Sequence, residues 1–77
     1  MLIQNISESW SEGVTLNAAE GWQCRDGIVL VTASDEGPEN RGIQLESGQA
    51  WAFPEGATVR YKRLVGSATT IAREPIA

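Results

Sequence analysis

Side chains that could do chemistry are few in this sequence. It has one cysteine, Cys24, and no histidine, so the usual general base of a nucleophilic site and the commonest metal ligand are both missing. The only lysine, Lys62, lies in a charged stretch, where a role as a catalytic base is a poor match. We therefore predict a protein that binds rather than catalyses, with no cofactor and no metal.

Two groups have both a chemical and a simpler interpretation. Cys24 precedes Arg25, whose charge would lower the pKa of the thiol, but we favour a small buried residue in a strand. Asp35, Glu36 and Glu39 carry the oxygen ligands that Ca²⁺ prefers. Their spacing is not that of an EF-hand loop, so we favour a solvated loop over residues 34–41.

Arg60, Lys62 and Arg63, with Tyr61 between them, form the one basic cluster. Basic and aromatic residues together bind single-stranded nucleic acid, but the net charge of the chain is −4, and an acidic chain repels phosphate backbones. We expect no nucleic-acid partner. The cluster is interpreted as a solvated face, or as a surface that pairs with acidic residues of a neighbouring subunit or partner.

Size and hydropathy limit the kind of protein. A chain of 77 residues predicts a single domain over residues 1–77 with a thin core, and such domains usually add disulfides, a metal or partner subunits. With one cysteine and no histidine, we predict a homo-oligomer. No apolar run approaches the roughly 20 residues of a membrane span, and residues 1–11 lack the features of a signal peptide, so we expect no membrane partner.

Glycine and proline recur at the spacing of short strands and turns. The pattern predicts an all-β fold, a small antiparallel β-sandwich or barrel of about seven short strands. The predicted strands cover residues 14–16, 22–24, 28–32, 42–45, 49–53, 57–65 and 68–73. Tight turns are predicted at residues 26–27, where they would form a hairpin, and at 46–48, 54–56 and 66–67.

Apolar alternation predicts which side chains face the core. The continuous apolar run at residues 28–32 favours a central strand buried on both faces. Trp22 and Trp51 are predicted core residues, and Trp51 shares a face with Phe53. In the strand over residues 57–65 the alternation slips at Arg63, which predicts a β-bulge there.

Residues 1–12 are interpreted as an extended N-terminal arm. Trp10 lies in a polar segment, and aromatic residues of this kind anchor interfaces; alternatively its ring closes one end of the core. We predict that Ile3, Ile6 and Trp10 dock onto a partner, and that removing residues 1–10 leaves a folded domain. The basic cluster is a second candidate for partner binding.

Three motifs carry a family resemblance. Residues 42–49 (G-I-x-L-x-x-G-Q), 54–61 (P-x-G-x-x-V-x-Y) and 66–69 (G-S-A-T) resemble segments of the small β-rich proteins of tailed-phage and prophage structural modules, among them head decoration and fibre-associated proteins. Residues 27–32 are similar to their central strand. The resemblance implies a virion component with no enzymatic role, often a trimer on a capsid or fibre.

The first functional hypothesis is therefore a capsid decoration or cement protein. It would be made in the host cytoplasm, reside in the virion and bind the major capsid protein or another virion component. A second hypothesis is a small acidic inhibitor of a host enzyme that mimics nucleic acid. A third is a carbohydrate-binding or fibre-tip module that stacks sugars on Trp10 or Tyr61.

Overall fold

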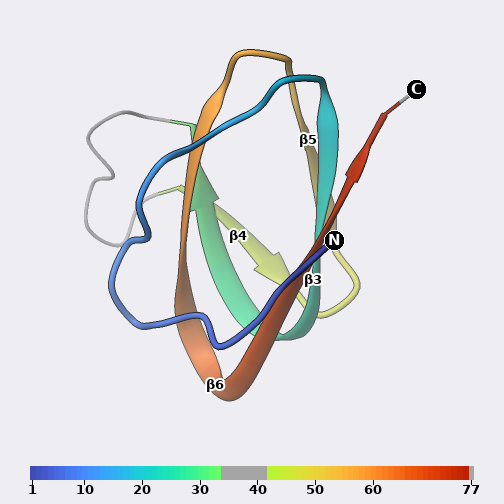
Figure 1. The fold of residues 1–77 in the computed structure, drawn as a ribbon. Coiled ribbons are helices and arrows are strands. Elements are labelled where there is room, and N and C mark those ends of the chain that lie inside the picture. The colour runs from blue at the N-terminus through green and yellow to red at the C-terminus, as the bar shows by residue number, and fades with distance from the viewer. Residues whose placement is uncertain (34–41, 77) are drawn as a thin grey trace.

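The computed structural model describes residues 1–33 and 42–76, and the side chains of all of these except residues 65–68. The strands of this part form one curled antiparallel sheet without a helix, which confirms the predicted all-β class (Figure 1). They are β1 (Leu2–Ile3), β2 (Val14–Thr15), β3 (Glu20–Thr32), β4 (Ile43–Glu46), β5 (Ala50–Phe53) and β6 (Thr58–Pro75). The order across the sheet is β1-β6-β3-β4, with β2 on β6 and β5 on β3.

The long strands β3 and β6 organise the fold. Their pairing runs from Glu20 opposite Pro75 to Thr32 opposite Arg60, so it spans β3 from its first residue to its last. Midway the register is irregular, and there Gly27 adopts a φ of 73°. Figure 1 shows both strands bending sharply at the same level, so that the two halves of the sheet face one another.

This bend corrects the predicted hairpin at residues 26–27. Residues 22–24 and 28–32 belong to one strand, and both segments pair with β6 rather than with each other. The positive φ of Gly27 redirects the strand without reversing it. The turn predicted at residues 66–67 is wrong for the same reason, because it lies inside β6, opposite the bend of β3.

The predicted β-bulge is confirmed. Ile28 is opposite Val65 and the next residue, Val29, is opposite Arg63, which leaves Leu64 as the extra residue of β6. Leu64 is 40 % exposed, as expected for an unpaired residue at a bulge.

The two other predicted turns are also confirmed. The N–H of Gln49 donates to the carbonyl oxygen of Glu46 at 2.8 Å, and Gly48 has a φ of 93°. The N–H of Ala57 donates to the carbonyl oxygen of Pro54 at 3.2 Å in the turn that leads into β6. Each turn thus joins two strands where the sequence predicted a connection.

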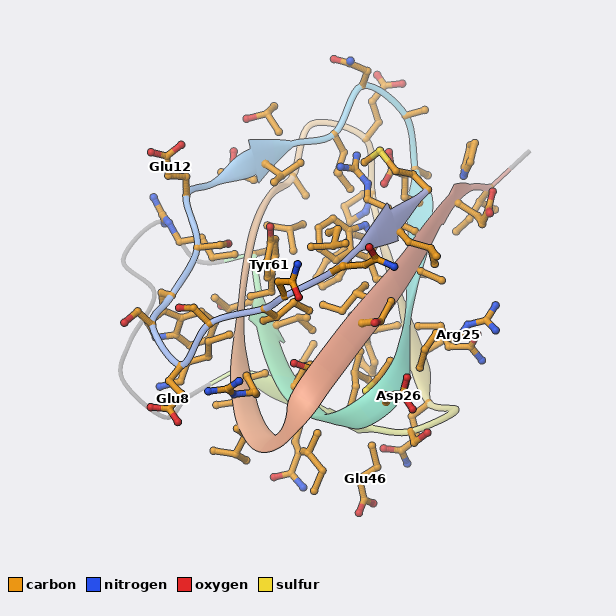
Figure 2. The ribbon with its side chains drawn as sticks, turned by 60° about the horizontal axis from the view of Figure 1, so that its bottom comes forward. Glu8, Glu12, Arg25, Asp26, Glu46 and Tyr61 are labelled. Atoms are coloured by element: carbon orange, nitrogen blue, oxygen red, sulfur yellow. The ribbon has the colours of Figure 1, made fainter. Side chains whose placement is uncertain are left out.

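The core lies between the two halves of the sheet. Trp22, which is fully buried, contacts Phe53 edge-on and Tyr61 at a tilt, in each case with ring centroids 5.9 Å apart. Trp22 lies opposite Arg73 in one half of the sheet, and Tyr61 lies opposite Val31 in the other half. The contact between their rings therefore joins the two halves. The side chain of Tyr61 lies near the centre of the molecule (Figure 2). The buried apolar core comprises Ile6, Leu16, Trp22, Cys24, Val29, Val31, Leu45, Phe53, Val59 and Ile71.

The second half of β3 is buried on both faces, as predicted. Val29 and Val31 are fully buried on the core side, and Leu30, which faces the other way, is 5 % exposed. Trp51, however, is 49 % exposed, so its assignment to the core is wrong for this chain alone. It lies on β5, which pairs with β3 on one side and has no strand on its other side among the described residues.

Candidate functional surface

The N-terminal segment lies along β6 instead of extending from the domain. In β1, Leu2 is opposite Ala72 and Ile3 is opposite Ile71. Further along, the N–H of Arg63 donates to the carbonyl oxygen of Ser7 at 2.7 Å. The interpretation of residues 1–12 as an extended arm is therefore wrong, because the edge of β6 supplies backbone partners for it.

The predicted docking residues of this segment lie in different surroundings. Ile6 is 3 % exposed and belongs to the core, and Ile3 is partly buried and packs against it. Ile6 is therefore not accessible to a partner in this fold. Trp10 is partly buried, with Lys62 Nζ 5.5 Å from the centroid of its ring, so it lies on its own domain. Its Nε1 is buried and has no hydrogen-bond partner in the structure.

The three residues of the basic cluster do not form one patch. Arg63 pairs with Glu8, with 3.1 Å between Nη2 and Oε1. Because adjacent residues of a strand point to opposite faces, Arg60 and Lys62 face away from Arg63. Lys62 is only 8 % exposed, and both it and Arg60 are engaged in other interactions. The prediction of a solvated basic face is therefore wrong for Lys62.

A partly buried ion pair joins β3 to β6. Nε of Arg73 donates to Oε1 of Glu20 at 2.8 Å, and Nη2 donates to Oε2 at 2.9 Å. The guanidinium also lies 5.2 Å from the centroid of the Trp22 ring, and Nε1 of Trp22 donates to Glu20 at 3.2 Å. The hydrogen bonds from Arg73 are the main reason that the pKa of Glu20 is below its ordinary value. Together these groups cover the Trp22 end of the core.

The thiol of Cys24 is buried, as favoured from the sequence. Burial raises its pKa, which contradicts the alternative that was not favoured, a thiol whose pKa is lowered by Arg25. Arg25 is exposed, and Figure 2 shows its side chain directed away from the sheet. Sγ instead lies 3.4 Å from the carbonyl oxygen of Asp26 and 3.3 Å from that of Gly27.

Apolar side chains also lie on the outside of the molecule. The exposed large ones are Met1, Leu2, Trp51, Leu64 and Ile76. The register places Leu2, Ala72, Gln23 and Ala50 in one row across four strands, on the outer face of the sheet. Gly21 and Ala52 lie opposite one another in the next row of the same face. Only small side chains therefore project from β5 on this outer face.

Trp51 is the surface residue that the sequence did not identify. It lies opposite the buried Trp22, on the core-facing side of β5, yet half of its surface is open. The alternation of apolar residues predicted correctly which face of the strand Trp51 lies on. It could not predict its exposure, which depends on whether another strand lies beyond β5. The side chains that the structure brings together at this edge are those of Ala50, Trp51 and Ala52.

No cavity is present among the described residues, and no group of three or more His, Cys, Asp or Glu residues within them is arranged to hold a metal ion. The carboxylates considered for Ca²⁺, Asp35, Glu36 and Glu39, lie outside the described residues. The described chain also contains no helix that is long and apolar enough to cross a membrane.

Comparison with known proteins gives a fold relationship. No protein-family model matches the chain, and curated protein sequences gave no significant match. Among solved structures, a cupin-2 domain-containing protein from Shewanella frigidimarina aligns with a TM-score of 0.60 and 18 % sequence identity. The alignment covers 97 % of this chain and 67 % of that protein. At this identity the match shows the fold alone: the chain has a cupin-like β fold.

Proposed function

We propose that this chain is a non-catalytic binding protein of a tailed-phage virion, which decorates or cements the capsid. The observation that carries the binding role is that apolar side chains remain exposed although the interior is already filled. Rings from both halves of the sheet fill the interior, where Trp22 meets Phe53 and Tyr61. Apolar side chains at the surface, Leu2 and Trp51 among them, are left to make contacts with other molecules.

The virion assignment is supported by the sequence motifs in the second half of the chain. Two of those motifs contain turns that the structure also has, at residues 46–48 and 54–56. The partner under this proposal is the major capsid protein or another virion component, bound by repeated copies of this chain. Many weak contacts then add to a stable attachment.

Mass spectrometry of purified phage particles tests the assignment. We expect tens to hundreds of copies per particle relative to the major capsid protein, which is the ratio that a repeated decoration requires. Particles lacking this chain should then open at a lower temperature, and adding the purified protein should restore the original temperature. Absence from particles, together with abundance in infected cells, would overturn the virion proposal and favour the host-enzyme inhibitor.

A further inference from the structure

We propose that β5 is a self-association edge, through which two copies of this chain pair antiparallel about a two-fold axis at Trp51. The sheets of the two copies would then become one continuous sheet. This inference concerns the contact between copies and does not depend on the virion proposal.

Apart from its short length of four residues, the exposed edge of β5 lacks the features that prevent strands from pairing. Edge strands of monomeric proteins usually carry charges, a proline or a bulge that blocks a second chain. The sequence of β5 is Ala-Trp-Ala-Phe, with no charge and no proline, and its pairing with β3 has no register shift. Two copies of a chain with a net charge of −4 would therefore meet at an uncharged strand.

The ladder to β3 determines which backbone groups of β5 are available. The N–H of Cys24 donates to the carbonyl oxygen of Gln49 at 2.9 Å. In an antiparallel ladder the bonded residues alternate, so Trp51 and Phe53 direct their N–H and C=O groups to β3. Ala50 and Ala52 direct theirs to the open edge.

A two-fold axis at Trp51 matches these groups to one another. Ala50 would lie opposite Ala52 of the partner subunit, and each of these residues would exchange hydrogen bonds with the other. Trp51 would lie opposite Trp51 of the partner subunit as a non-bonded pair, the position in which facing side chains are closest, with Cα atoms about 4.5 Å apart. Aromatic pairs at such positions stabilise antiparallel strands.

The exposure of Trp51 favours a second copy as the occupant of this edge. The indole lies on the core-facing side of the sheet, in register with the fully buried Trp22, but remains 49 % exposed. The indole of the partner would cover it, and the core-facing side would then continue across the axis. On the opposite face only the methyl groups of Ala50 and Ala52 project from β5, so nothing bulky hinders the approaching strand.

Sedimentation of the full chain over a range of concentrations tests the proposal. We expect a dimer, and we expect Ala52→Pro to raise its dissociation constant at least about tenfold, because proline removes an N–H that points to the open edge and is tolerated at such a position. Ala52→Ser, which keeps the N–H, is the matched control and should dimerise like the wild type. A monomer at all concentrations, a trimer, or equal dissociation constants for the proline and serine variants would each overturn the proposal.

Crosslinking gives a second test that does not require the proline variant to fold. In Trp51→Cys the new thiols would face each other across the axis, within the Cα separation of about 4.4–6.8 Å that a disulfide needs. Cys24 is buried and should not react. Under mild oxidation we expect a covalent dimer to form faster than in Ala18→Cys, a control with the new thiol at an exposed position outside β5. Equal rates for the two variants would contradict the two-fold contact.

Discussion

Glu20 and Arg73 form a doubly hydrogen-bonded ion pair across β3 and β6, although 53 positions separate them in the sequence. Their side chains are 14 % and 16 % exposed, so water screens this pair less than a surface pair. The guanidinium also covers the Trp22 ring. The pair therefore links the start of β3 and the end of β6 to Trp22, the main aromatic residue of the core.

The stability contributed by Glu20 should depend on pH. Its folded-state pKa is below the ordinary value, so its contribution is fully present above the pKa of the unfolded chain and is lost as the pH falls through the folded-state pKa. Glu20→Gln should cost about 1–3 kcal/mol at pH 7, because it leaves Arg73 without its charged partner. Urea unfolding at pH 7 and at pH 3 measures the difference, which should shrink at the lower pH.

Glu74→Gln is the matched control for this experiment. Its carboxylate is 76 % exposed and lies 3.6 Å from the N-terminal amine, so the loss should be within about 0.5 kcal/mol at either pH. If both variants lose the same amount at pH 7, the ion pair between Glu20 and Arg73 has no special role.

Gly42 and Gly56 should respond differently to alanine. Both have positive φ, at 119° and 85°, so alanine introduces backbone strain of about 1–3 kcal/mol at either position. At Gly42 an added Cβ would also lie 2.7 Å from the carbonyl oxygen of Val31, whereas at Gly56 nothing lies within 4 Å. We expect Gly42→Ala to lower the thermal midpoint more than Gly56→Ala does. If calorimetry finds the larger loss in Gly56→Ala, the close contact between an added Cβ at Gly42 and Val31 is refuted.

The N-terminal segment should be needed for stability. Ile6→Ala removes a core side chain and should cost about 2–5 kcal/mol, against a total of about 4–12 kcal/mol expected for a domain of this length. Removing residues 1–10 should cost more still, which replaces the expectation that the remaining domain folds unaffected. Leu2→Ala, at a residue that is 55 % exposed, is the control and should change the urea midpoint little.

The thiol of Cys24 should react slowly with a disulfide reagent in the native protein. Burial shields the sulfur and raises its pKa, so little thiolate is present at neutral pH. We expect labelling to accelerate strongly in denaturing urea. Rapid labelling of the folded protein would show that this part of the core opens readily.

Local signals in the sequence predicted the local structure well. The glycines of two turns, Gly48 and Gly56, lie where positive φ is needed, and the slip in alternation at Arg63 corresponds to a real bulge. The same signals did not show how far a strand continues. At Gly27 the sequence predicted a reversal, but the strand only bends, because β6 offers bonding partners on both sides of the bend.

The candidate site depended on long-range information. Trp51 was placed on the correct face, but its exposure follows from β5 lying at an edge, which no local pattern records. Ile6 has no apolar neighbour at strand spacing that would mark it as core. Its burial follows from the path of the N-terminal segment along β6, and that path is set by tertiary pairing.

The pairing of β3 with β6, two strands far apart in the sequence, also has a kinetic consequence. The partners nearest in sequence, Thr32 and Arg60, already enclose a long loop, and every further pair up to Glu20 and Pro75 encloses a longer one. Closing such loops costs chain entropy before the contacts compensate for it, so we expect folding in milliseconds to seconds rather than microseconds. Stopped-flow refolding should show that the pairing of β3 with β6 forms first near Thr32 and last near Glu20.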